Sequence, residues 1–411
     1  MKRMLATLLA AAMLVSMSAC SSSSSTESSA PGGEPASSED AAAPEEPPEE
    51  DDAAPTADGE TIKIGGLAPL TGDVSQYGTA VDNAVKLAVA DINAAGGVLG
   101  KQVEYICYDE KGDANEAVNA YNKLVNDDGV VALVGDVTSK PTEAVAQRAL
   151  DDNLPMITAS GTAEGITQGR PNVFRACFID PFQGQLMASY AINKLGAKTA
   201  AILFDNGDPY STGIADAFEA YAKENGLEIV AKEGYQTGTP DFNSQLTTIK
   251  EKNPDVLMIP VYYQDVALIA VQAKNLGLTS KMLGADGWDG VLEKIDASNV
   301  DALKDVYFCS QYSAESTDEN LQSFLATYKE TYGLEANMFA VLGYDAMQIM
   351  AAAINKAGST DPDAIIAALG ETNYAGLTGT TTFDESNNPV REAIITTVAD
   401  GAYKFVENYK M

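Results

Sequence analysis

The chain has 411 residues, of which 45% are hydrophobic and 21% are charged, a composition that supports two domains with buried cores and excludes a wholly disordered chain. It contains 26 Lys and Arg against 59 Asp and Glu, so its net charge at neutral pH is −33. That charge repels phosphate groups, and we expect no nucleic-acid partner. The sequence has no histidine, which excludes Ser/His/Asp and Cys/His nucleophiles and His-bearing zinc sites.

Residues 1–19 have the features of a signal peptide, because Lys2 and Arg3 precede an apolar run, Leu5–Val15, that is too short to span a bilayer. The tetrapeptide Met17-Ser18-Ala19-Cys20 resembles a bacterial lipobox, with methionine where leucine is usual. The resemblance implies lipidation of Cys20. An ordinary secretory signal with an incidental cysteine is the alternative, and the serine run that follows Cys20 favours the lipoprotein.

Residues 21–60 are acidic and poor in bulky apolar side chains. They contain twelve acids, six prolines and no Lys or Arg. Such a stretch cannot bury enough surface to offset its chain entropy, so we expect 20–60 to be a disordered acidic tether that starts at the lipidated cysteine. When the twelve acids of this stretch and the cations Lys2 and Arg3 are subtracted from the whole chain, a net charge of −23 remains on residues 61–411.

Three further cysteines, Cys107, Cys177 and Cys309, lie far apart and lack metal-ligand spacing. Each lies in or beside an apolar run. A structural disulfide is an alternative in an exported protein, but unpaired cysteines that act as small buried hydrophobic residues are favoured. We expect no catalytic residue, no metal and no cofactor.

From residue 61 onward, short apolar runs that end in turn residues alternate with helical patterns. The predicted strands are Ile62–Leu67, Val130–Val134, Met156–Thr158, Ala200–Phe204, Val256–Ile259, Met282–Leu283 and Val306–Phe308. The predicted helices are 80–93, 114–126, 141–152, 182–195, 212–225, 241–252, 264–275, 318–332 and 340–357. This alternation predicts an α/β fold with parallel sheets covered on both faces. About nine such units favour two doubly wound lobes, with a TIM barrel as the alternative.

Hydroxyl-rich loops follow the strands of the first half, at the edge where open α/β sheets bind ligands. Ser139 precedes one predicted helix, and Ser160 and Thr162 lie in the turn after the next strand. Backbone N–H groups and hydroxyls at two helix starts form a receptor for a carboxylate. Each loop taken alone is more simply an ordinary helix cap.

The loops after later strands contain tyrosines and an acid instead. Tyr210 and Tyr262 each follow a strand, and Asp286 lies in a glycine-flanked turn. A carboxylate with tyrosine rings and hydroxyls suits an ammonium group. Taken singly, the aspartate reads as a surface turn residue and the tyrosines as half-buried packing. Taken together, the two sets of loops describe a zwitterion held between two domains, which indicates an amino acid.

At these residues the chain resembles the leucine/isoleucine/valine-binding proteins that serve ABC transporters. The resemblance covers essentially all of 61–411, and its first-lobe motifs are specific as a set. The motifs are Pro69–Gly72, Gln76–Gly78, Asp91–Gly100, Asn122–Val125, Gly135–Ser139, Met156–Thr162, Ser211–Gly213 and Thr380–Asp384. It implies a type I periplasmic-binding-protein fold with a three-crossover hinge, in which 61–179 plus 311–380 form lobe 1 and 180–310 plus 381–411 form lobe 2.

The resemblance also implies a role for each matched position. These are Ser139 and Thr162 for the ligand carboxylate, Ser160 for a backbone contact, Tyr262 and Asp286 for the ammonium group, and Tyr77 and Tyr210 for aromatic walls of the side-chain pocket. Asp286 stands where the family frequently has glutamate, and Ser160 replaces a small apolar residue. These departures leave the amino-acid backbone site intact and bear on the side-chain preference.

The sequence therefore predicts a monomeric, membrane-anchored, extracytoplasmic lipoprotein that captures a small amino acid, most simply a branched-chain one, and delivers it to ABC permease subunits by hinge closure. A sensory ligand-binding module of the same fold, for a different amino acid or amide, is the alternative. An enzyme is the weakest reading, since no nucleophile–base pair or phosphate loop is present.

Overall fold

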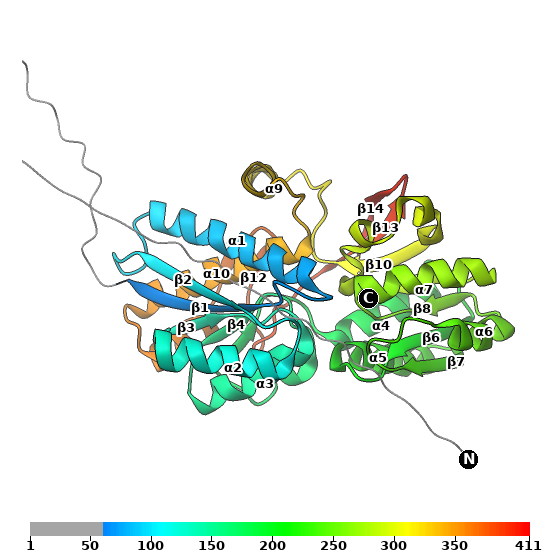
Figure 1. The fold of residues 1–411 in the computed structure, drawn as a ribbon, viewed down its shortest axis with the longest axis horizontal. Helices are drawn as coiled ribbons and strands as arrows, with labels where there is room; N and C mark the ends of the chain where they lie inside the picture. The colour runs from blue at the N-terminus through cyan, green and yellow to red at the C-terminus, as the bar shows by residue number, and fades with distance from the viewer. Residues whose placement is uncertain (1–60) are drawn as a thin grey trace, which may run out of the picture. The chain divides into compact units, whose positions relative to one another are not determined.

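The computed structural model describes residues 61–411. The predicted signal peptide, the predicted lipidation site Cys20 and the predicted acidic tether lie outside the described residues. Within 61–411 the chain builds two α/β lobes around two open sheets (Figure 1). Because the sheets are open, the TIM-barrel alternative is wrong and the two-lobe prediction is confirmed.

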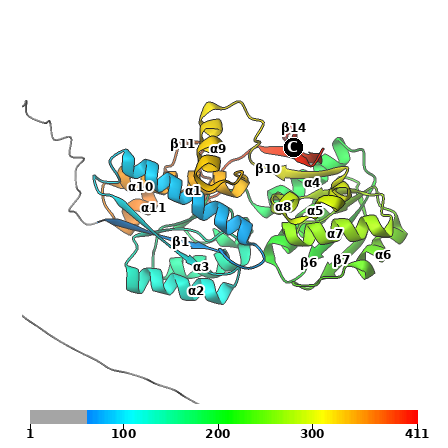
Figure 2. The ribbon, with the colours of Figure 1, turned by 45° about the horizontal axis from the view of Figure 1, so that its top comes forward.

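Lobe 1 surrounds a five-stranded parallel sheet of order β2-β1-β3-β4-β5. Helices α1 and α10 cover one face of this sheet, and α2 and α3 cover the other (Figures 1 and 2). Its elements are β1 Ile62–Ala68, α1 Ser75–Ala94, β2 Val103–Asp109, α2 Ala114–Lys123, β3 Ala132–Val134, α3 Ser139–Asp151, β4 Met156–Thr158, β5 Val173–Arg175, α9 Glu319–Tyr332, α10 Met338–Ala357, α11 Pro362–Gly370, β11 Tyr374–Gly376 and β12 Gly379–Thr381.

Lobe 2 surrounds a seven-stranded sheet of order β14-β13-β10-β9-β8-β6-β7. Helices α4 and α5 pack together on one face, and α6 and α7 pack together on the other. Its elements are α4 Asp180–Asn193, β6 Thr199–Asp205, α5 Pro209–Glu224, β7 Glu228–Tyr235, α6 Asn243–Lys252, β8 Val256–Met258, α7 Tyr263–Leu276, β9 Lys281–Gly284, α8 Val291–Lys294, β10 Val306–Ser310, β13 Ala393–Ala399 and β14 Ala402–Tyr409.

The second sheet is not wholly parallel. Strand β13 runs antiparallel to both of its neighbours, β10 and β14, and β13 and β14 form the C-terminal edge of the sheet. An antiparallel edge on an otherwise parallel sheet is common in large α/β folds. The two strands join through a tight turn at Asp400 and Gly401, both with positive φ, so no crossover helix is needed.

The chain passes between the two sets of layers three times: after β5, after β10 and after β12. Helix α10 is long and apolar enough to cross a membrane by length and composition alone. Most of its side chains, however, are buried against α1 and the first sheet. It is therefore a core helix of lobe 1, and its N-terminal turn reaches the region between the lobes.

Candidate functional site

A small cavity lies between the two lobes at the carboxyl ends of the strands, with an empty volume of about 200 Å³. Lobe 1 and lobe 2 both contribute to its walls. The lining residues are Val137, Thr138, Ser139, Ser160, Thr162, Tyr210, Tyr262, Asp286, Gly287 and Phe339. The cavity thus collects six of the seven ligand-binding residues that the sequence predicts.

Ser139 and Thr162 meet on the lobe 1 side of the cavity. Ser139 is the first residue of α3, and its Oγ accepts hydrogen bonds from the N–H groups of Thr162 (3.3 Å) and Ala163 (3.2 Å). It does not cap its own helix, so the simple helix-cap interpretation of Ser139 is wrong. A hydroxyl has two acceptor lone pairs and one donor. With both lone pairs occupied, Ser139 keeps its proton to donate, either to Thr162 Oγ1 at 3.4 Å or to a ligand.

The surrounding loop is held from behind by buried contacts. Ser160 Oγ donates to the carbonyl of Val137 (2.9 Å), so its side chain braces the loop before α3. The buried guanidinium of Arg175 donates to the carbonyls of Gly161 and Ala163, both at 2.9 Å. The side chain of Thr138, the residue before α3, makes no capping bond. First-turn N–H groups of α3 therefore remain available, and a helix N-terminus favours an anion.

Asp286 is the acidic group of the lobe 2 side. It is 2% exposed, and its Oδ1 accepts hydrogen bonds from the Tyr210 hydroxyl and the Gly287 N–H, each at 2.9 Å. Its own N–H donates to the side-chain carbonyl of Gln183 (3.0 Å). Burial raises the pKa of Asp286 to about 6, although the hydrogen bond from Tyr210 opposes the shift. A cation in the cavity would restore the ionised form.

Two tyrosines complete the lobe 2 wall. The rings of Tyr210 and Tyr262 stack with centroids 4.6 Å apart and planes 8° apart. Among the described residues no group completes a hydrogen bond to the buried Tyr262 hydroxyl, although the Asp208 carboxyl lies near it. Such a buried polar atom without a partner is costly unless a ligand or water satisfies it. It is therefore a ready acceptor for an ammonium group.

Tyr77 is the one predicted site residue that does not line the cavity. It is fully buried in the first turn of α1, and its ring stacks on Phe339 with centroids 3.9 Å apart. Phe339, in the first turn of α10, supplies the aromatic wall that the resemblance implied for Tyr77. The contribution of Tyr77 to that wall is indirect, through the Phe339 ring on which it stacks.

Other residues near the site were missed by the sequence reasoning. Phe339 lies more than 170 residues from the matched first-lobe loops, and its helix resembles any other apolar core helix. The buried Asp180 and the half-buried Asp208 add two acids near the lobe 2 wall. Burial raises the pKa of Asp208 to about 6 and that of Asp180 well above its ordinary value. The sequence contained a signal for both aspartates, because each directly precedes a proline at the start of a helix.

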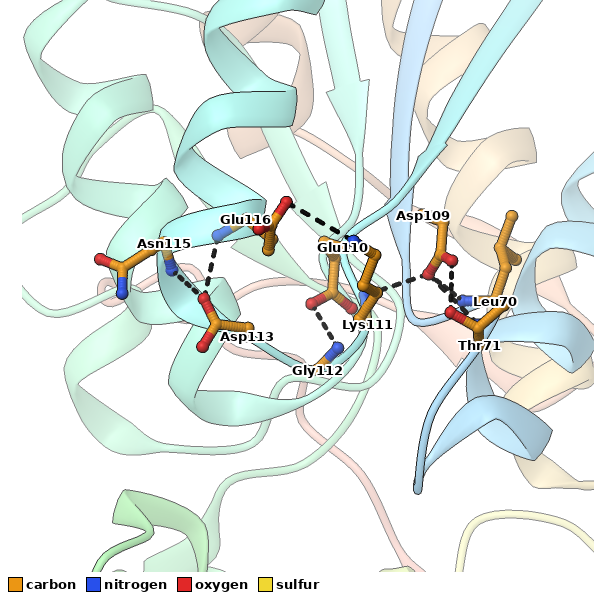
Figure 3. A network of polar contacts seen from close by, with 9 residues as sticks. All are labelled: Leu70, Thr71, Asp109, Glu110, Lys111, Gly112, Asp113, Asn115 and Glu116. Atoms are coloured by element: carbon orange, nitrogen blue, oxygen red, sulfur yellow. Dashed lines mark hydrogen bonds and ion pairs between the residues drawn. The ribbon is translucent and has the colours of Figure 1, made fainter. Parts of the chain in front are cut away.

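The loop between β1 and α1, which leads to Tyr77, is fixed by a polar network with the loop after β2 (Figure 3). The carboxylate of Asp109 accepts hydrogen bonds from the N–H groups of Leu70 (2.9 Å) and Thr71 (3.2 Å) and from the Thr71 hydroxyl (2.5 Å). These bonds lower the pKa of Asp109 against the opposing effect of partial burial. The network keeps the start of α1 in a defined position at the lobe interface.

Cys107, Cys177 and Cys309 are unpaired, so the described chain contains no disulfide. Cys177 and Cys309 are fully buried and Cys107 is partly buried. Burial raises the pKa of Cys177 to about 12, which keeps the thiol protonated and unreactive. The expectation of buried, unpaired cysteines is confirmed for Cys177 and Cys309, whereas Cys107 is unpaired but only partly buried.

The fold and the cavity define a two-lobed α/β ligand-binding protein, whose site lies between its lobes. Residues 61–402 match the periplasmic binding protein family. The chain belongs to this family, which is one of binding proteins, and the resemblance noted from the sequence is confirmed.

Several relatives share most of the chain's length. A leucine-, isoleucine-, valine-, threonine- and alanine-binding protein of Pseudomonas aeruginosa is 31% identical over 80% of this chain and 87% of its own. The crystal structure of a leucine-binding protein from Thermotoga maritima is similar with a TM-score of 0.80 and 32% identity, covering 85% of this chain and 98% of that one. The branched-chain amino acid transporter substrate-binding protein of Streptococcus pneumoniae, in complex with isoleucine, gives a TM-score of 0.78 and 34% identity, covering 84% and 99%.

Proposed function

We propose that this protein is the solute-binding component of an ABC importer and that it binds leucine, isoleucine or valine between its lobes. The names of the relatives from Pseudomonas aeruginosa and Streptococcus pneumoniae support the transport role and the ligand class. The site itself supports a zwitterion with an apolar side chain. The relative named as a transporter substrate-binding protein favours transport over a sensory module of the same fold.

The observation that carries the proposal is the opposition of two kinds of polar group across one small cavity. The Ser139 hydroxyl and the free N–H groups of α3 lie on the lobe 1 side and suit a carboxylate. Asp286 and the unpartnered Tyr262 hydroxyl lie on the lobe 2 side and suit an ammonium group. Val137 and Phe339 add apolar surface, which suits an aliphatic side chain better than a charged one.

In this proposal the ligand binds first to lobe 1 through its carboxylate, and closure of lobe 2 then adds Asp286 and the tyrosines. Only the closed protein makes both sets of contacts, so the ligand favours closure by its differential affinity for the two states. The proposed lobes are 61–179 plus 311–380 and 180–310 plus 381–411, joined by a three-crossover hinge. The binding site needs residues from both, and no covalent chemistry is involved.

The proposed location is the outer face of the cell membrane, with the folded part attached through a lipid on Cys20 and delivering its ligand to the permease subunits. The lipobox-like tetrapeptide and the acidic segment up to residue 60 support this anchoring. Metabolic labelling with a tagged fatty acid tests it directly. We expect label on the wild-type protein and none on the Cys20→Ser variant, and equal labelling of the two would refute lipidation at this residue.

Calorimetric titration with leucine and two truncated analogues tests the amino-acid site. 4-Methylpentanoate lacks the ammonium group and 3-methylbutylamine lacks the carboxylate, so each leaves one half of the site unpaired. We expect leucine to bind at least about a hundredfold tighter than either analogue, since unpairing a buried charge costs roughly 3 kcal/mol. Leucine should also bind at least about tenfold tighter than glycine, because its side chain adds roughly 1.5–3 kcal/mol of burial. Tighter binding of aspartate than of leucine would overturn the branched-chain assignment.

A further inference from the structure

Two helices from opposite lobes, α1 and α7, begin without a capping side chain of their own. The residues before them are Val74 and Tyr262, and neither makes a side-chain capping bond. The first N–H groups of a helix have no partner within the helix, and Ser, Thr, Asp or Asn usually satisfies one of them. At α1 and α7 the partner comes from the other lobe.

Each helix receives its capping acceptor from a tyrosine of the facing helix. The N–H of Tyr263, the first residue of α7, donates to the hydroxyl of Tyr77 at 3.2 Å. The N–H of Gln76 in the first turn of α1 donates to the hydroxyl of Tyr263, with a longer separation of 3.5 Å. The capping is therefore reciprocal between lobe 1 and lobe 2.

The same two hydroxyls also act as donors across the interface. Tyr77 donates to the carbonyl of Gly287 at 2.6 Å, and Tyr263 donates to the carbonyl of Asp73 at 2.8 Å. Their rings meet edge to face, with centroids 4.8 Å apart and an interplanar angle of 88°. Tyr77 is 0% and Tyr263 2% exposed. The two bonds of the Tyr77 hydroxyl are buried from water, and the two bonds of the Tyr263 hydroxyl are partly buried.

We propose that Tyr77 and Tyr263 form an interlobe clasp that sets ligand affinity by stabilising the closed protein, without either side chain touching the ligand. Neither residue lines the cavity. The clasp also has a positioning effect, because Tyr77 holds the carbonyl of Gly287, the residue after Asp286. The part of this inference that concerns ligand affinity rests on the proposed amino-acid binding function.

A clasp differs from a pocket wall in how it treats different ligands. A wall residue contributes more to a large side chain than to a small one, since its contribution scales with the apolar area it covers. A clasp adds the same free energy to every closed complex, whatever the ligand. When the lobes separate, its hydroxyls exchange the interlobe bonds for bonds to water, so the net gain per bond is modest.

The test uses the full chain and the substitutions Tyr77→Phe and Tyr263→Phe, which remove each hydroxyl and keep each ring. We expect each substitution to lower the affinities for leucine, valine and alanine by the same factor, about three- to tenfold, because the ligands dissociate faster. Tyr121→Phe is the matched control, because that buried hydroxyl donates to Asp152 within lobe 1 (2.9 Å). It should leave all three affinities unchanged, and thermal melts check that every variant is folded.

If Tyr77→Phe lowered the affinity for leucine alone, Tyr77 would be a wall of the side-chain pocket and the clasp would be overturned. An unchanged affinity of the Tyr263→Phe variant would also overturn it. Small-angle X-ray scattering without ligand separates this inference from the proposed function. We expect a larger radius of gyration for the Tyr77→Phe/Tyr263→Phe double variant than for wild type and Tyr121→Phe. Equal radii would overturn the clasp even if leucine binds, whereas a larger radius would support it even if another solute were the ligand.

Discussion

The hydroxyl of Tyr210 donates a 2.9 Å hydrogen bond to Oδ1 of Asp286, and the same hydroxyl accepts the N–H of Gly287 at 2.9 Å. The buried carboxylate is thus held in place by neutral groups. Neutral donors orient an acid without cancelling its charge. Asp286 therefore keeps its capacity to pair with a cationic group in the cavity, which is the basis of the first prediction.

Asp286→Asn should weaken leucine binding about a hundredfold. The amide keeps an acceptor oxygen for Tyr210 and for the Gly287 N–H, so the loss isolates the charge, and leaving a buried ammonium unpaired costs roughly 3 kcal/mol. Calorimetric titration measures it. Glu293→Gln, which alters an exposed acid on α8, is the control and should bind leucine normally. An unchanged affinity for Asp286→Asn would remove Asp286 from the site.

The same residue predicts how affinity depends on pH. Burial raises the pKa of Asp286 to about 6 in the free protein, and a bound ammonium favours the ionised form. Binding therefore expels a proton from Asp286 at pH below about 6, and affinity should fall as the pH is lowered from 7 to 5. The fall should be smaller in Asp286→Asn. Parallel pH profiles of the two proteins would mean that other groups, such as Asp208, dominate the dependence.

Ser139→Ala should weaken ligand binding by about 1.5–3 kcal/mol, because a hydrogen bond to a charged group is lost. The Ser139 oxygen already accepts two N–H groups, so its proton is the part that a carboxylate would use. Ser189→Ala serves as the control, since that buried hydroxyl bonds to Tyr409 in lobe 2 at 2.8 Å. If Ser139→Ala lowered the melting temperature without changing the affinity, its role would be structural only.

Phe339→Ala should reduce the preference for leucine over glycine by at least about tenfold, since the apolar wall facing the side chain is lost. Truncating a buried phenylalanine also destabilises the fold by roughly 3–5 kcal/mol. Phe324→Ala in α9, which removes another buried ring outside the cavity, controls for that loss. Competition titrations of leucine against glycine on both variants measure the ratio. The same ratio in the two variants would exclude Phe339 from side-chain recognition.

Glu110→Gln should stabilise the protein at alkaline pH. Glu110 and Asp136 are both 0% exposed and lie within hydrogen-bonding reach of one another beneath the loop that leads to Ser139 (Figure 3 shows Glu110). Burial, and next the neighbouring Asp136 charge, raise the pKa of Glu110 far above its unfolded value. The pair therefore stabilises the fold fully below the unfolded pKa of about 4.3, and this contribution is lost as the pH rises toward the folded-state pKa.

The amide variant does not titrate, so its advantage over wild type should be small at pH 5 and should grow toward pH 9. Thermal melts across this range measure it. Glu116→Gln, which changes an exposed acid in the nearby first turn of α2 (Figure 3), should follow the wild-type profile. If the Glu110→Gln protein were less stable than wild type at every pH, ionisation of Glu110 would not be what destabilises the wild-type fold at alkaline pH.

The sequence predicts the central strands better than the edge strands. Central strands such as β1 and β8 are buried on both faces and read as continuous apolar runs. The strands that the sequence reasoning missed include all four edges of the two large sheets, β2, β5, β7 and β14. Strand β7 is half-buried along most of its length, so its composition resembles that of an amphipathic loop. Most predicted helix boundaries lie within three residues of the observed ones, as for α3, which starts at Ser139 instead of 141. Helix α1, however, starts at Ser75 instead of 80, and α11 was not predicted.

What the sequence by itself determined is which loops form the site. Alternating strands and helices predict a parallel sheet, and a parallel sheet gathers the loops after its strands at one edge. That rule places the loops that carry Ser139, Thr162 and Asp286 at the same edge. Only the tertiary structure decided which side chains at that edge face the cavity. The Tyr77 side chain bonds to the other lobe, and Phe339 forms the aromatic wall of the cavity. The sequence does not show this, because the contact between the lobes depends on packing between residues that are distant in sequence and leave no local pattern.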